Sequence, residues 1–190
     1  AYGDAGLAVT SDPDWADRIR CLRNHGMEPK YHHKLLGWNA RLDTLQAALL
    51  RVKLPHLDAW IEARQAAARR YDALIDEHHV GGFLQRPTVR PQCRHVFHQY
   101  VVRVGRGQRD ALLRHFRADK IGCEIYYPIP LHMQECLDYL GYREGDFPAS
   151  ERAAQDVLAL PMFPEISADQ QDRVVQSVAR FLRQQARIAA

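Results

Sequence analysis

The chain has 190 residues, of which 46% are hydrophobic and 26% charged, and its net charge at pH 7 is +3. This composition is ordinary for a globular protein large enough to bury a core. No apolar run approaches the length of a membrane span, and no charged and then apolar leader opens the sequence. We therefore expect an unsecreted, cytoplasmic protein without a membrane partner.

Basic and acidic residues are interspersed along the chain. A nucleic-acid interface usually gathers its arginines and lysines on one face, so nucleic acid is not an expected partner. An arginine-rich nucleic-acid binder stays as an alternative, which predicts binding that weakens steeply with salt. The cysteines show no close pairing and favour a reduced chain: they are Cys21, Cys93, Cys123 and Cys136.

The first residues are typical of the middle of a fold. The chain begins with Ala1 rather than methionine, and a glycine-rich turn leads into Leu7–Val9, which we expect to form a strand. We therefore expect that the N-terminal part of a larger protein is missing from this sequence.

Two helices are predicted in the first third of the chain. The first starts at Ser11–Asp14, where a capping side chain precedes a proline and an acid, and it ends before Gly26. A polar loop follows. The second helix opens in the stretch Gly37–Leu50, and its predicted apolar face consists of Leu42, Leu45, Leu49 and Val52.

Further elements follow from the change of periodicity along the chain. Pro55 either kinks the second helix or starts a new one that continues to Leu74. Residues 81–94 are typical of a linker. The remaining predictions are strands at 96–104 and 123–127, and helices at 109–120, 150–158 and 167–184, the last with a Ser167–Gln170 capping box. This order indicates two lobes joined near residues 76–95.

Asn39 and Arg41 are the first candidate binding residues. A helix N-terminus carries free N–H groups and a partial positive charge, so it favours an anion. Asn39 can cap such a helix and present its amide to a phosphate, and Arg41 adds a planar cation. The alternative is that Asn39 only caps the helix and Arg41 is only a surface charge.

Histidines and tyrosines form two further candidate sites. His132 follows a predicted strand, where it can bind a polar ligand or shuttle a proton, or simply pack on the neighbouring tyrosines. Tyr31 and His32 belong to a polar-aromatic loop that either closes over a ligand or is merely solvated. A zinc site at Cys93, His95 and His98 is not expected, because no second ligand pair has suitable spacing.

Several segments, taken in order, resemble the DegT/StrS family of pyridoxal-phosphate-dependent sugar aminotransferases. The resemblance covers essentially the whole chain. Its motifs are Ala1-Tyr2-Gly3-Asp4-Ala5-Gly6, Leu22-Arg23-Asn24-His25-Gly26, Gly37-x-Asn39-x-Arg41-Leu42-Asp43, Tyr127-Pro128-Ile129-Pro130-Leu131-His132, Gly145-Asp146-Phe147-Pro148 with Glu151, and Leu158-Ala159-Leu160-Pro161-Met162-Phe163-Pro164.

The resemblance implies an α/β protein, the C-terminal portion of the type I (aspartate aminotransferase-like) fold. Residues 1–75 would be the end of the large cofactor-binding domain with the long interdomain helix, and residues 76–190 the small C-terminal α/β domain. The family acts as a homodimer or larger assembly, and it moves an amino group from glutamate to a keto group of a nucleotide-linked sugar. The cofactor is pyridoxal 5'-phosphate.

The resemblance also assigns residues. Asn39 would reach the cofactor phosphate of the neighbouring subunit, and Arg41 would strengthen either that anion site or the dimer interface. Tyr31, His32, Tyr127 and His132 would border the sugar-nucleotide pocket. The family's Schiff-base lysine lies just before the Ala-Tyr-Gly-Asp segment, so we expect it about four residues upstream of Ala1 and expect this chain alone to be inactive.

A different class of function stays open. A half-protein without the catalytic lysine can act as a non-catalytic binding or interaction module, docking through the apolar face of the 42–52 helix. The sequence does not distinguish which keto sugar, which carbon or which pathway is involved.

Overall fold

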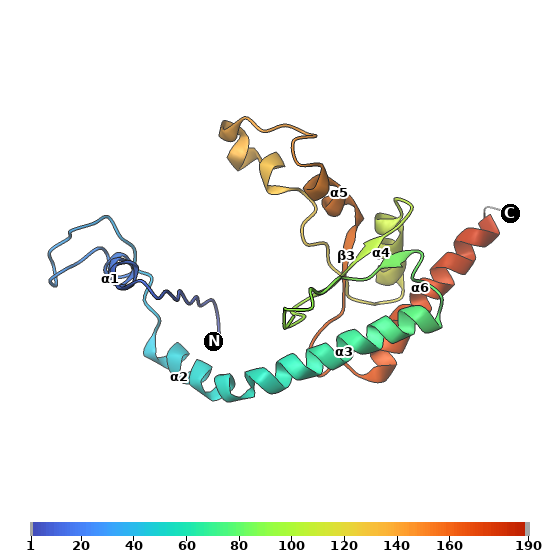
Figure 1. The fold of residues 1–190 in the computed structure, drawn as a ribbon, viewed down its shortest axis with the longest axis horizontal. Coiled ribbons are helices and arrows are strands. Elements are labelled where there is room, and N and C mark those ends of the chain that lie inside the picture. Colours follow the sequence, from blue (N-terminus) through green and yellow to red (C-terminus); the bar gives the residue numbers. More distant parts are fainter. Residues whose placement is uncertain (1, 189–190) are drawn as a thin grey trace. The chain divides into compact units, whose positions relative to one another are not determined.

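The computed structural model describes residues 2–188, so Ala1, the first residue of the first family motif, lies outside them. The chain divides into two compact units, one ending at Leu57 and one beginning at Asp58. Figure 1 shows the helices and strands of each unit. Among the described residues, no helix combines the length and apolar character needed to cross a membrane.

The first unit consists of short helices joined by long loops. Its elements are α1 (Pro13–Leu22), α2 (Thr44–Lys53) and the 3₁₀ turn η1 (Leu54–His56). The start of α1 is confirmed: the Asp12 carboxylate accepts the N–H groups of Asp14 and Trp15 at 2.9 and 3.2 Å, and Pro13 opens the helix. The strand predicted at Leu7–Val9 is wrong, because this segment is exposed and pairs with no other described strand.

The predicted role of Asn39 as a helix cap is also wrong. Helix α2 begins at Thr44 with Asp43 at the N-cap position, and the Asp43 side chain makes no capping hydrogen bond. Asn39 instead pairs with Asn24 in an isolated antiparallel bridge. This long-range backbone pairing holds the segment extended, so the helix predicted to open at Gly37 starts only after it.

The loop that precedes α2 is closed by two glycines. Gly26 has a φ of +68°, and a Cβ there would lie 1.9 Å from the Leu35 carbonyl oxygen. A Cβ at Gly37 would lie 2.3 Å from the Gly26 nitrogen. The backbone therefore crosses itself at Gly26 and Gly37, where the absence of side chains allows the close approach. Two backbone hydrogen bonds depend on this crossing: Lys34 N–H donates to the Gly26 carbonyl, and Trp38 N–H donates to the Leu22 carbonyl.

The face of α2 that was predicted to be apolar is not buried within this unit. Leu45 and Val52 are 72% and 69% exposed, and no residue of α2 is buried. Pro55 lies in η1, which separates α2 from the long helix α3 (Leu57–Glu77). The proline therefore marks a break followed by a new helix rather than a continuous one.

The second unit is built on a three-stranded antiparallel sheet in the order β1-β2-β3. Its elements after α3 are β1 (Leu84–Gln85), β2 (Tyr100–Val104), α4 (Arg109–Ala118), the 3₁₀ segments η2 (Leu131–Met133) and η3 (Glu135–Leu140), α5 (Pro148–Asp156), β3 (Val157–Leu160) and α6 (Ala168–Ile188). In the central strand, Tyr100, Val102 and Val104 are buried and alternate with half-buried residues, as expected for one face turned to a core.

Helices α3, α4 and α6 supply the rest of that core. The rings of Tyr71 and Tyr100 stack with centroids 5.1 Å apart, which joins α3 to β2. Phe116 of α4 is fully buried, and the ring centroids of Phe181, in α6, and Phe83 lie 5.9 Å apart. Since four buried residues of α3 belong to this cluster, Ala68, Tyr71, Leu74 and Ile75, the C-terminal half of the helix packs within the second compact unit.

Local sequence signals predict some of these elements better than others. Helix α4 and its buried Leu112, Leu113 and Phe116 are confirmed. The capping box is confirmed as well, since Ser167 and Gln170 exchange side-chain hydrogen bonds with each other's N–H groups at 3.2 and 2.9 Å.

Other predictions in this unit need correction. The strand predicted at 123–127 is reduced to a single bridge between Glu124 and Ala159. The helix predicted to reach Leu158 ends at Asp156, and β3 follows at once. The apolar run that begins at Val157 pairs with β2, so tertiary pairing overrides the apparent helical continuation.

We expect Gly26→Ala to open the 24–40 loop. The substitution combines positive-φ strain with a backbone clash, which together cost roughly 3 kcal/mol or more. Amide hydrogen exchange at Trp38 and Lys34 would report the loss. Gly107→Ala is the matched control, because Gly107 has a similar φ of +63° with nothing within 4 Å of the added Cβ. Equal effects of the two substitutions would show that the close crossing is unimportant.

Candidate functional site

The base of the 24–40 loop carries two hydrogen-bond donors without a charged partner. Arg41 donates from Nη1 to the Asn24 Oδ1 atom at 3.2 Å and forms no ion pair with any described residue. The Asn39 side chain is exposed and makes no hydrogen bond within residues 2–188. A neutral amide oxygen does not compensate the guanidinium charge, so this pair of side chains suits an anion.

The tip of the same loop carries Tyr31 and His32. Tyr31 is 76% exposed, and the Lys30 ammonium lies 4.8 Å from the centroid of its ring. The His32 backbone closes the tip by donating to the Pro29 carbonyl at 3.0 Å and accepting from Glu28 at 2.8 Å. Both predicted residues are exposed at the tip of this loop.

In the second unit, the Glu151 carboxylate collects three donors. Gly145 N–H donates to both of its oxygens at 2.9 and 3.0 Å, and Phe147 N–H donates to Oε1 at 3.2 Å. Oε1 also lies 2.9 Å from His132 Nε2. Since an ionised carboxylate only accepts, Nε2 carries the proton. We call Glu151, His132, Gly145 and Phe147 the clasp.

The clasp places His132 beneath the surface. Its side chain is only 8% exposed, and that of Glu151 is 16% exposed. The ring of Phe147 lies 4.8 Å from the His132 ring, and Tyr142 packs edge-on against Phe147 at 5.0 Å. His132 is thus largely enclosed by its own loop, in contrast to Tyr127, which is 72% exposed.

The electrostatics of the clasp follow from these hydrogen bonds. Desolvation by burial acts to raise the pKa of Glu151, but the N–H groups of Phe147 and Gly145 and the His132 side chain outweigh it and lower the pKa below its usual value. The carboxylate is therefore ionised at neutral pH.

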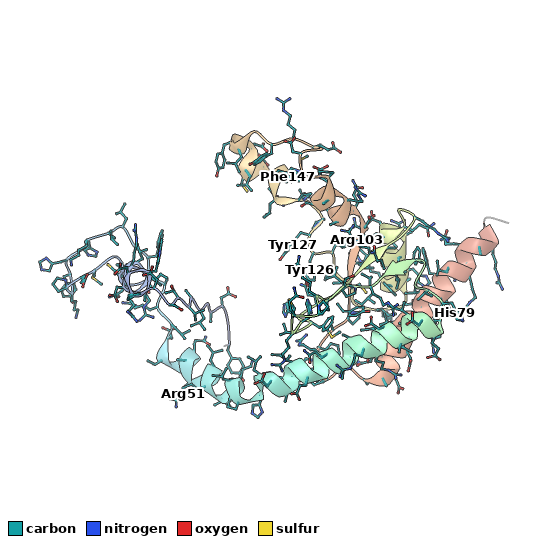
Figure 2. All side chains as sticks on the ribbon, in the orientation of Figure 1. Arg51, His79, Arg103, Tyr126, Tyr127 and Phe147 are labelled. Carbon is teal, nitrogen blue, oxygen red and sulfur yellow. The ribbon has the colours of Figure 1, made fainter. Side chains whose placement is uncertain are left out.

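A groove of about 380 Å³ lies beside the clasp. One wall is the 126–131 segment and the other is formed by α5, where Ser150, Ala153 and Ala154 line it. Figure 2 shows Tyr126 and Tyr127 at this segment; their rings meet edge to face at 5.8 Å.

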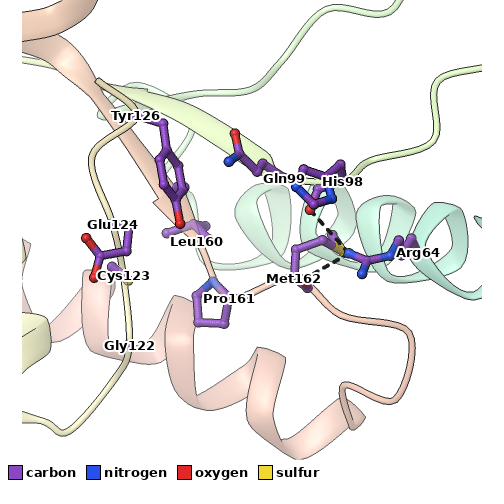
Figure 3. A pocket seen from close by; sticks show the side chains of 11 residues that line it. Arg64, His98, Gln99, Gly122, Cys123, Glu124, Tyr126, Leu160, Pro161 and Met162 are labelled. Carbon is purple, nitrogen blue, oxygen red and sulfur yellow. Dashed lines mark hydrogen bonds between the residues drawn. The ribbon is translucent and has the colours of Figure 1, made fainter. Parts of the chain in front are cut away.

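A separate pocket of about 280 Å³ lies next to the sheet (Figure 3). The Arg64 guanidinium at its rim donates to the carbonyls of His98 and Met162 at 3.2 and 3.1 Å. Burial raises the pKa of the Cys123 thiol in its wall to about 12, so this sulfur stays protonated and is not a nucleophile at neutral pH. Arg64 thus bonds to backbone carbonyls of its own unit, and Cys123 belongs to the hydrophobic core.

The histidines of the 93–98 segment are engaged locally. His95 Nδ1 accepts the Phe97 N–H at 3.0 Å, and the two rings lie 4.4 Å apart. Within residues 2–188 there is no group of three or more histidine, cysteine or acidic residues arranged to hold a metal ion.

The sequence does not indicate the contacts of two residues in these sites. Asn24 and Glu151 both lie inside family motifs, yet neither has a local pattern that reveals its partner. Glu151 in the first turn of α5 is typical of an acid that favours a helix N-terminus. Its contact with His132, and that of Asn24 with Arg41, exist only once the chain is folded.

Solved structures similar to this chain include sugar aminotransferases of one family. S. venezuelae DesV, determined in complex with a ketimine intermediate, superposes with a TM-score of 0.83 and 37% identity, covering 91% of this chain and 45% of that one. A DegT DnrJ EryC1 StrS aminotransferase from Brucella abortus superposes with a TM-score of 0.78 and 34% identity, and the match covers 90% of this chain and 44% of that one. The fold is therefore the C-terminal portion of the type I transferase fold, as predicted.

The family follows from the sequence comparison. Residues 1–179 match the DegT/DnrJ/EryC1/StrS aminotransferase family, and the chain belongs to it. A pleiotropic regulatory protein of Geobacillus stearothermophilus is 45% identical over 96% of this chain and 48% of its own length. The UDP-N-acetyl-3-dehydro-alpha-D-glucosamine 3-aminotransferase of Acidithiobacillus ferrooxidans is 41% identical over 96% of this chain and 47% of its own length. The chain thus spans about half the length of these curated relatives.

We expect Glu151→Gln to destabilise the second unit at pH 7, because a neutral amide accepts the three N–H groups more weakly. The pKa of Glu151 is lower in the folded state, so its contribution is present above the ordinary carboxyl value of 4.5 and is lost as the pH falls through the folded pKa. The difference in Tm between wild type and variant should therefore shrink below about pH 4.5. A difference that persists unchanged at pH 3 would contradict the assignment. Glu144→Gln, at an exposed neighbour, is the control.

Proposed function

We propose that this chain forms the C-terminal half of a pyridoxal-phosphate-dependent aminotransferase that moves an amino group from glutamate to a keto group of a nucleotide-linked sugar. The observation that carries the proposal is the match of residues 1–179 to the family, together with relatives named as UDP-sugar and dTDP-sugar aminotransferases. The pathway would be one of surface-polysaccharide or secondary-metabolite biosynthesis, as the names of related proteins suggest.

The donors of the first unit fit the cofactor's phosphate. Asn39 offers an exposed amide and Arg41 a guanidinium whose charge no described residue compensates. When bound, the cofactor supplies the site that accepts and releases the amino nitrogen. Asn39 would bind the phosphate of the neighbouring subunit's cofactor, and Arg41 would raise the local positive potential and fix the orientation of the anion.

The remaining predicted residues would contact or shape the substrate. Tyr31 and His32 would close over the sugar nucleotide from the exposed loop tip, and Tyr127 would border it with its exposed ring. His132 would support that border. The lysine that bonds to the cofactor is expected upstream of Ala1, so the proposal gives none of this chain's four lysines that role.

The assembly and location are part of the same proposal. The complete protein would be a cytoplasmic homodimer. The exposed apolar side chains on α2 support the dimer, since Leu45 and Val52 remain uncovered within their unit. The two domains would be the end of the large domain, residues 1–75, and the small domain, residues 76–190.

A chimera tests the proposal. This chain would replace the matching C-terminal half of the A. ferrooxidans aminotransferase, and transfer of ¹⁵N from labelled glutamate to its UDP-linked keto sugar would be measured. We expect a working enzyme. Asn39→Asp and Arg41→Ala should each raise the dissociation constant of the cofactor by roughly 10- to 100-fold, because each removes a hydrogen bond to a charged group.

Arg51→Ala serves as the matched control, because Arg51 is an exposed arginine on α2 with no hydrogen bond or ion pair within the described residues. A chimera that folds and binds the nucleotide sugar, but transfers no nitrogen, would favour the non-catalytic binding module instead. Equal cofactor affinities in the Asn39, Arg41 and Arg51 variants would remove the assigned phosphate site.

A further inference from the structure

The clasp connects two parts of the second unit that are far apart in the chain. His132 lies in η2, directly after the Tyr127–Leu131 segment, whereas Glu151 lies in α5. The segment and the helix are the two walls of the groove of about 380 Å³. The contact between Glu151 Oε1 and His132 Nε2, at 2.9 Å, thus ties one wall to the other.

The short segment between Tyr127 and His132 connects this contact to the exposed wall of the groove. Pro128 and Pro130 fix two of the φ angles in the four-residue segment between the exposed Tyr127 and the enclosed His132. Phe147 packs on the His132 ring and donates its N–H to Glu151. The short, proline-containing segment therefore couples the backbone position of Tyr127 to that of His132.

We propose that Glu151 is a positioning residue that acts through His132 to hold the Tyr127 wall of the groove in its substrate-binding arrangement. This inference rests on the proposed function, which gives Tyr127 its place beside the nucleotide sugar. It changes the part assigned to His132: with 8% of its side chain exposed and Nε2 engaged, His132 supports the binding surface rather than contacting the ligand.

Charge explains why a carboxylate serves here. The N–H groups of Gly145 and Phe147 and the Nε2–H group of His132 all reach Glu151 Oε1, and Gly145 N–H also reaches Oε2. Three donors on one oxygen favour an ionised acceptor, because hydrogen bonds to a charged group are stronger than those to a neutral one. Glu151→Gln is nearly isosteric and keeps one oxygen, but it removes the negative charge and turns an NH₂ group toward the Gly145 N–H.

The experiment uses ¹⁵N-labelled chain and two readouts. Amide hydrogen exchange of Gly145 and Phe147 reports the clasp itself. The dissociation constant of UDP-N-acetylglucosamine, followed through the Tyr127 side-chain resonances, reports the groove. For Glu151→Gln we expect exchange to accelerate about tenfold or more and the ligand to bind about tenfold more weakly, with unchanged far-UV circular dichroism. Glu144→Gln, in the same loop, should match wild type in both.

His132→Gln separates positioning from direct contact. We expect it to weaken binding and accelerate the exchange of Gly145 and Phe147 together. Weaker binding with both amides still protected would overturn the proposal, since His132 would then touch the ligand itself. Equal ligand affinity in wild type and Glu151→Gln would overturn it too. Wild type can also show protected amides but no binding of the nucleotide sugar. That result would contradict the proposed substrate, and with it the positioning role, while confirming the contacts of the clasp.

Discussion

The pairing of β3 with the buried strand β2 is the constraint on which the second unit depends. Four residue pairs join these strands, from Tyr100 opposite Leu160 to Arg103 opposite Val157, and β3 begins at the residue after α5 ends. Arg109 reinforces the junction by donating to the carbonyls of Ala154 and Val157 at 2.9 and 3.3 Å. The sheet therefore fixes the C-terminal end of α5, and with it the helix that carries Glu151.

The first unit holds its candidate residues by a different constraint. Its donors lie on extended backbone at the base of a loop, where a bridge between Asn24 and Asn39 replaces the helix end that the sequence indicates. The crossing of Gly26 and Gly37 sets the path of that loop. A backbone fixed by steric contact presents side chains with little loss of conformational entropy on binding, which suits an anion site.

Sequence signals succeeded where the information is local. The Asp12–Pro13 start of α1 and the Ser167–Gln170 capping box use neighbours within one helical turn, so their geometry follows from the sequence alone. The signals failed at Asn39, at β3 and at residues 123–127, where the outcome depends on a partner strand or bridge more than ten residues away. Family likeness located the segments of the candidate site but not its internal contacts, since neither the Asn24–Arg41 nor the His132–Glu151 pair has a fixed spacing signal.

The hydrogen-bond partners of each charged side chain indicate whether it can bind a ligand or only supports the fold. Arg64 donates to backbone carbonyls on two segments, so moving it to a ligand would strand those oxygens, and its role is structural. Glu151 is likewise saturated by three donors. Arg41 meets only a neutral amide oxygen, and the Asn39 carboxamide is exposed. A bound anion would therefore gain hydrogen bonds at Arg41 and Asn39 without breaking ionic ones. At Arg64 it would have to displace existing hydrogen bonds, and at Glu151 it would meet a carboxylate of its own sign.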